Sequence, residues 1–209
     1  FDILGPVSLS DFSGNVLVIL TISFLIVIAG LGYVVYLDVL RKDGNERIRF
    51  HSKLVFMITR ILLVVGTLGT YLLERTNPGT LGQMAGEGEK ILNAFFQAVT
   101  TRTAGYFSCD QASMTTAGAF LSICLMFIGG SPGGVAGGIK TTTIAAILVG
   151  TKNEIKGSED SPIFNRNIPA ETIHKAFMIF MSAFLWCVVV VFILSITDPQ
   201  VSLLDNIYE

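Results

Sequence analysis

Apolar residues along the chain fall into long runs that polar segments separate. The runs 15–37, 54–73 and 173–196 are each long enough to cross about 30 Å of hydrocarbon as a helix. A fourth run, 114–128, is helical in pattern but shorter. Runs of this length are typical of helical membrane proteins, so the pattern predicts an all-α integral membrane protein.

Residues 89–106 join a short helical pattern to a polar stretch. Residues 89–100 predict a helix less than about 20 Å long, too short to span a bilayer. Residues 101–106, Thr-Arg-Thr-Ala-Gly-Tyr, follow it, and the apolar run 114–128 comes soon after. A half-length helix followed by irregular backbone is typical of a re-entrant pore loop, because such backbone is tolerated at membrane depth only where protein or a water-filled path surrounds it. We therefore interpret the loop as one part of a cation filter.

A glycine-rich segment, residues 129–138, interrupts the next helix. Its six glycines and Pro132 exclude a stable helix, whereas the helical pattern resumes over 139–150. A phosphate-binding loop needs glycine directly before Lys-Thr, and Ile139 intervenes here; the glycine spacing of a dinucleotide-binding motif is also absent. A simple kink needs fewer glycines. The remaining interpretation is a mobile, gate-like loop beneath the filter.

Charge placement gives the orientation. Five basic residues lie in 38–53 and four between Lys152 and Lys175, whereas the outer loop holds only Arg75 and Lys90. The positive-inside rule then places residues 38–53 and the segment from Lys152 to Lys175 in the cytoplasm.

Composition excludes several other classes of protein. Only 14% of residues are charged, and the net charge of −2 gives no footprint for nucleic acid. The mean hydropathy is +0.65. Three scattered cysteines and two distant histidines argue against a disulfide framework or a zinc site. The chain begins without Met or a basic leader, so it looks like a piece of a longer protein.

The filter hypothesis assigns a role to each residue type near Gly105. Backbone carbonyls replace the hydration shell of a cation, Gly105 supplies unusual backbone angles, and Thr103 and Ala104 are small enough for close approach. The short helix points its partially negative C-terminus at the ion. Arg102 is expected to point away and to hydrogen-bond the back of the loop or the outer mouth. Asp110 either adds negative potential at the mouth or is a solvated turn residue.

Two further basic residues keep open interpretations. Arg60, inside an apolar run, either stabilises helix packing or lies near the pore. Lys140, after the glycine-rich segment, either tunes cation passage or reaches the cytoplasmic interface.

The motifs TTRTAGY (100–106) and MFIGGSPGGVAGGIKTTT (126–143) resemble the third repeat of the Trk/Ktr/HKT superfamily of potassium transporters, and in particular the membrane subunit of bacterial Ktr systems. The resemblance implies pseudo-symmetric helix–pore loop–helix repeats around a central ion pore. Residues 1–53 would then be the end of the second repeat, 54–172 the third, and 173–209 the start of the fourth. The chain twice shows an outer loop that is followed by a descending helix with glycines, which agrees with such a repeat.

The resemblance also implies site residues. The third filter segment would be Thr103, Ala104, Gly105 and Tyr106. The gating loop would comprise Gly129, Gly130, Ser131, Pro132, Gly133, Gly134, Gly137 and Gly138, with Lys140 directly after it.

The implied function is potassium uptake across a bacterial cell membrane, without enzymatic chemistry or a bound cofactor. Potassium would be the permeating ion and sodium a candidate coupling ion; a glycine in every filter repeat accompanies potassium selectivity in the family, and Gly105 agrees. The implied partners are a second copy of the protein, the lipid bilayer and a cytosolic ring of nucleotide-binding (RCK-type) regulatory subunits that contacts 38–53 and 151–172. The alternatives are a secondary transporter of an organic solute that uses a discontinuous helix, a nucleotide-dependent membrane enzyme, and a non-conducting scaffold.

Overall fold

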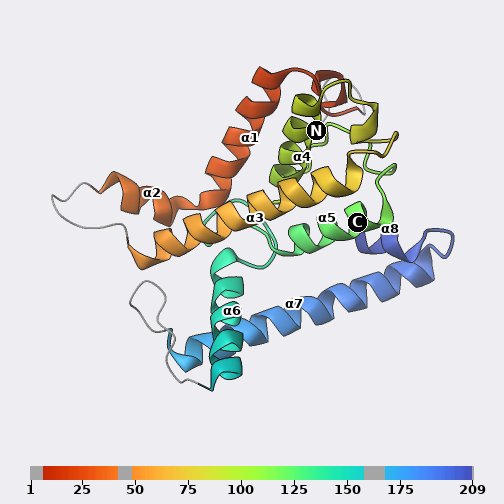
Figure 1. Cartoon of the computed structure of the whole chain (residues 1–209). Helices are drawn as coiled ribbons and strands as arrows, with labels where there is room; N and C mark the ends of the chain where they lie inside the picture. Colours follow the sequence, from red (N-terminus) through yellow and green to blue (C-terminus); the bar gives the residue numbers. More distant parts are fainter. Residues whose placement is uncertain (1–6, 42–48, 158–167, 209) are drawn as a thin grey trace.

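The computed structural model describes residues 7–41, 49–157 and 168–208, and every regular element within them is helical (Figure 1). The α-helices are α1 Val16–Leu31, α2 Tyr33–Leu40, α3 Phe50–Glu74, α4 Glu87–Thr100, α5 Thr116–Phe127, α6 Thr141–Lys156, α7 Ala170–Thr197 and α8 Leu203–Tyr208. Two short 3-10 turns, Ser10–Phe12 and Leu81–Gln83, lie in the connections. The all-α prediction is confirmed. Part of each expected cytoplasmic segment, 42–48 and 158–167, lies outside the described residues.

Two of the described helices, α3 and α7, are by length and composition able to cross a membrane alone. Helices α1 and α2 would together count as a third span, but they meet at 89°. The prediction of one unbroken helix over 15–37 is therefore wrong. The break falls at Gly32, whose φ of 85° and ψ of 148° are incompatible with a continuing helix.

The half-length helix α4 is the most enclosed element, and it packs against both α1 and α3 (Figure 1). Phe96 and Val99 in its second half are fully buried. Gly66 of α3 allows this packing, since a Cβ there would lie 2.8 Å from the Cβ of Ala98. The helix thus ends deep inside the protein, where the partial negative charge of its C-terminus can stabilise a bound cation.

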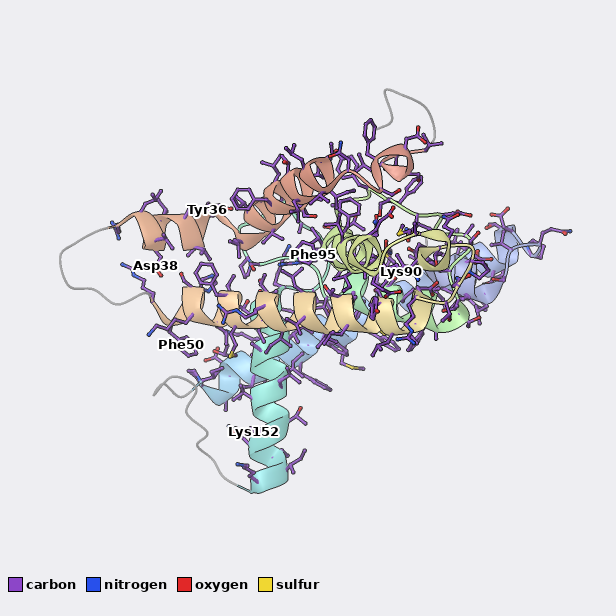
Figure 2. All side chains as sticks on the ribbon, turned by 45° about the horizontal axis from the view of Figure 1, so that its top comes forward. Tyr36, Asp38, Phe50, Lys90, Phe95 and Lys152 are labelled. Carbon is purple, nitrogen blue, oxygen red and sulfur yellow. The ribbon has the colours of Figure 1, made fainter. Side chains whose placement is uncertain are left out.

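Helix α6 is longer than the helical pattern over 139–150 predicts. It continues past Gly150, where a Cβ would lie 2.4 Å from Ile173 of α7, and ends at Gly157 in a left-handed conformation with φ of 60°. Gly150 is thus a packing residue and Gly157 the helix stop. Figure 2 shows α6 standing steeply away from α3, with Lys152 in its second half.

Helix α7 forms one edge of the molecule in Figure 1, beside α6 and α8. None of the residues in its most apolar window is buried within the described chain. Phe180 makes an edge-to-face contact with Phe127 of α5, with ring centroids 5.6 Å apart. The rest of this apolar surface is free to meet lipid or further protein.

Candidate functional site

The chain changes direction at the end of α4. The Ala104 N–H donates to the Thr100 carbonyl at 3.0 Å, and two residues then take positive φ: Thr103 at 65° and Gly105 at 79°. The Thr100 hydroxyl donates a hydrogen bond to the Tyr106 carbonyl at 2.5 Å. Within the described part of the chain, the carbonyls of Thr103, Ala104 and Gly105 accept no hydrogen bond. Three successive carbonyls are therefore available to a cation.

Gly105 lies in open space. A Cβ there would meet no atom within 4 Å, so crowding does not explain the glycine. The positive φ does, because L-residues rarely adopt it.

Arg102 is turned away from this open space. It is only 4% exposed, and its Nη2 donates to the Thr59 hydroxyl of α3 at 3.3 Å. The same Nη2 lies near Gly30, 3.7 Å from where a Cβ would stand, at the C-terminal end of α1, where a positive charge is favourable. The partner is thus a neighbouring helix rather than the back of the loop or the outer mouth.

Two glutamines on either side of residues 103–106 in the sequence bond to each other. Gln97 of α4 and Gln111 exchange amide hydrogen bonds of 2.8 and 3.0 Å. Gln111 also receives the Tyr208 hydroxyl of α8 at 2.6 Å. Amides that satisfy each other in this way fix the path of the chain after residue 106. The sequence did not predict this pair, although a glutamine in an otherwise apolar helix was a signal.

Glu74 forms a second support at the outer end of α3. Its carboxylate is 1% exposed and accepts four hydrogen bonds from two loops. Asn77 Nδ2 and the Thr80 hydroxyl donate at 2.7 and 2.6 Å, and Thr115 donates from N–H and hydroxyl at 3.0 and 2.5 Å. Thr115 is the N-cap of α5, so the negative charge also lies at a helix N-terminus. The sequence does not reveal this site, because Thr115, which donates two of the four hydrogen bonds, is 41 residues away.

Asp110 is a turn residue. Its carboxylate accepts the Ala112 N–H at 3.1 Å and the Ser113 hydroxyl at 2.6 Å.

Arg60 is exposed on the surface of α3. Burial raises the pKa of the Cys109 thiol to about 11, so this cysteine stays protonated. Among the described residues, no three His, Cys, Asp or Glu side chains are grouped closely enough to hold a metal ion.

The glycine-rich segment between α5 and α6 folds into a closed loop. The Gly130 N–H donates to the Gly137 carbonyl at 3.3 Å, and the Ile139 N–H donates to the Phe127 carbonyl at 3.0 Å. A Cβ at Gly129 would lie 1.7 Å from the Gly137 carbonyl oxygen, so the two arms of the loop approach each other as closely as glycine permits. The expected helix break is confirmed.

The loop touches the filter segment directly. The Gly137 N–H donates to the Thr103 hydroxyl at 2.9 Å. The Lys140 ammonium folds back on the loop and donates to the Ala136 carbonyl at 2.7 Å. Lys140 therefore does not extend to the cytoplasmic interface. The half-length helix, the segment with three free carbonyls and the closed glycine loop are thus neighbours in the structure.

Comparison with known proteins identifies the family of the chain. The family model described as TrkH, cation transport protein, matches residues 1–209. The chain belongs to the TrkH family. Its relatives are ion transporters, not enzymes, and the chain is part of a multi-pass membrane protein.

Three curated relatives are similar to the chain. The potassium/sodium uptake protein NtpJ of Enterococcus hirae is 37% identical, over 99% of this chain and 46% of that protein. The Ktr system potassium uptake protein B of Bacillus subtilis is 34% identical, over 99% and 46%. The protein of the same name from Vibrio alginolyticus is 33% identical, over 91% and 42%. The chain spans about half the length of these relatives.

A solved structure supports the fold. The potassium transporter TrkH from Vibrio parahaemolyticus matches 92% of this chain and 42% of that chain with a TM-score of 0.73 and 18% identity. This likeness confirms the membrane-transporter fold.

Proposed function

We propose that the chain forms part of a potassium uptake pore, with Thr103, Ala104, Gly105 and Tyr106 as one segment of its selectivity filter. Two curated relatives are named as potassium uptake proteins and a third as a potassium/sodium uptake protein, which supports potassium as the ion. The free carbonyls of this segment at the C-terminus of α4 supply the oxygen ligands and negative potential that a cation needs.

The observation that carries the proposal is the hydrogen bond between Gly137 and Thr103. This bond joins the glycine-rich loop to the proposed filter segment, which supports a loop that lies in the path of an ion that has passed the carbonyls. Residues 129–138 are on this proposal a gate that blocks the pore until the loop moves. Lys140, bound to the Ala136 carbonyl, adds a positive charge that opposes cation entry while the loop is closed.

The whole protein, on this proposal, has four such repeats, of which this chain contributes the end of the second, the third and the start of the fourth. It works in the bacterial cell membrane as a homodimer on a cytosolic ring of nucleotide-binding, RCK-type subunits. The relatives named as protein B of a Ktr system support a separate component. Sodium is the proposed coupling ion.

The test is potassium uptake by cells that lack their own uptake systems and express the full-length parent of this chain. We expect growth at low external potassium, and we expect Gly105→Asp to abolish it because the new side chain is strained and projects into the path. Gly86→Asp is the matched control, since Gly86 is exposed, has a negative φ of −121° and has no neighbour within 4 Å of a new Cβ.

Growth of the Gly105→Asp cells at the wild-type rate would contradict the filter assignment. No growth with the wild-type parent, despite membrane expression with its regulatory partner, would favour a transporter of an organic solute or a non-conducting scaffold.

A further inference from the structure

The gating loop, residues 129–138, rests on the bend between α1 and α2, here called the elbow and comprising residues 28–36. The contact is made by backbone atoms. The Ser131 N–H donates to the Gly30 carbonyl at 3.0 Å, and the Tyr33 N–H donates to the Gly133 carbonyl at 3.1 Å. Gly30 is in the last turn of α1 and Tyr33 is the first residue of α2, so the loop supplies partners that helix ends otherwise lack.

Gly32 makes this contact sterically feasible. Its φ is +85°, and a Cβ would lie 2.4 Å from the Pro132 carbonyl oxygen and 3.0 Å from the Gly134 nitrogen. Gly30 differs, because a Cβ there would meet only the Arg102 guanidinium, at an ordinary 3.7 Å. The contact with the loop thus requires glycine at 32 but not at 30.

The elbow is itself firmly held. The Tyr36 hydroxyl donates across the bend to the Ile28 carbonyl. At the other end of α2, Asp38 accepts the Arg49 N–H at 2.9 Å and so joins α2 to the start of α3. Figure 2 shows α2, with Tyr36 and Asp38, alongside the part of α3 that begins at Phe50. A loop bonded to this elbow is therefore bonded to a fixed surface.

We propose that the elbow is the seat that holds the gating loop in its blocking position, with Gly32 and Tyr33 as positioning residues. The proposal rests on the function of the loop as a gate. The two backbone hydrogen bonds exist only when the loop is seated, so a change that weakens them shifts the population toward pores in which the loop has moved.

The experiment uses the full-length parent reconstituted in proteoliposomes without its regulatory partner. Potassium flux, the preference for potassium over sodium, and amide hydrogen exchange of residues 129–138 are measured together. Gly32→Ala is expected to raise flux at least about tenfold, because the clash of its Cβ with the Pro132 carbonyl oxygen and the Gly134 nitrogen exists only in the seated arrangement. Loop exchange is expected to rise and the ion preference to stay unchanged. Gly30→Ala adds the same atom two residues away and is expected to change each quantity far less.

A second pair of variants covers the case in which Gly32→Ala does not fold. Tyr33→Pro removes the N–H that binds Gly133, at a first helical position where proline is favoured. Tyr33→Ala removes the ring but keeps the N–H. Tyr33→Pro is expected to exceed Tyr33→Ala in flux by about two- to tenfold, the factor by which one backbone hydrogen bond shifts an equilibrium.

Equal flux and equal loop exchange within both pairs would overturn the proposal. Deletion of residues 132–135 separates this failure from failure of the gate itself. If that deletion raises flux and the elbow variants do not, the elbow is not the seat. If the deletion leaves flux unchanged while the elbow variants still raise loop exchange, the elbow does hold the loop and the loop is not a gate.

Discussion

At the scale of single residues, Thr103 combines a strained backbone with a contact to the loop. A β-branched residue at φ of 65° costs about 1–3 kcal/mol, which the surrounding structure must offset. The hydrogen bond from Gly137 to its hydroxyl contributes to that offset. The residue therefore joins the filter segment to the loop.

Thr103→Val removes the acceptor while it keeps the shape and the branched Cβ. We expect basal potassium flux through the full-length parent to rise about two- to tenfold, because the closed loop loses one hydrogen bond. Thr103→Ser keeps the oxygen and is expected to stay near wild type. Identical flux in the two variants would mean that this bond does not hold the loop.

Glu74 offers a prediction about stability. Glu74→Gln places an amide NH₂ where one carboxylate oxygen now accepts hydrogen bonds, and it removes the charge at the start of α5. We expect a loss of about 2–4 kcal/mol of unfolding free energy, seen as a lower Tm in detergent. Glu171→Gln is the control, since its exposed pair with Lys175 contributes less than about 1 kcal/mol. Equal Tm values for the Glu74→Gln and Glu171→Gln variants would mean that Glu74 does not stabilise the contact between the two outer loops.

At the scale of elements, the half-length helix and the glycine-rich break were predictable because each has a local signal. A helix too short to span, and six glycines with Pro132 in ten residues, leave few alternatives. The elbow was not predictable. Gly30 and Gly32 lie in one apolar run, and glycine is tolerated inside membrane helices, so only the contact with residues 131–134 distinguishes the break from close packing.

The deletion of residues 132–135 tests the loop as an element. The bonds from Gly130 to Gly137 and from Ile139 to Phe127 lie outside the deleted part, so the base of the loop can still close. We expect higher potassium flux with unchanged ion preference, because the obstruction is shortened while the filter segment is intact. Unchanged flux in a correctly folded protein would contradict the assignment of this loop as a gate.

At the scale of the whole molecule, two parts of the described chain have no neighbours to cover them. The proposed filter segment borders open space at Gly105, and the apolar window of α7 is unburied in the described chain. The chain also covers only 46% of two curated relatives. Further repeats would cover both surfaces.

A filter encloses a dehydrated ion with carbonyls from several sides. On the proposed function, this chain holds one filter segment, whose carbonyls are free in the described structure. Residues 1–209 expressed alone are therefore expected to give no growth at low potassium in cells without uptake systems, whereas the full-length parent does. The Gly105→Asp parent is the matched negative control, and membrane content of each protein is measured by quantitative blotting. Growth supported by residues 1–209 at comparable membrane content would mean that copies of this piece assemble a working pore, and it would contradict the requirement for the other repeats.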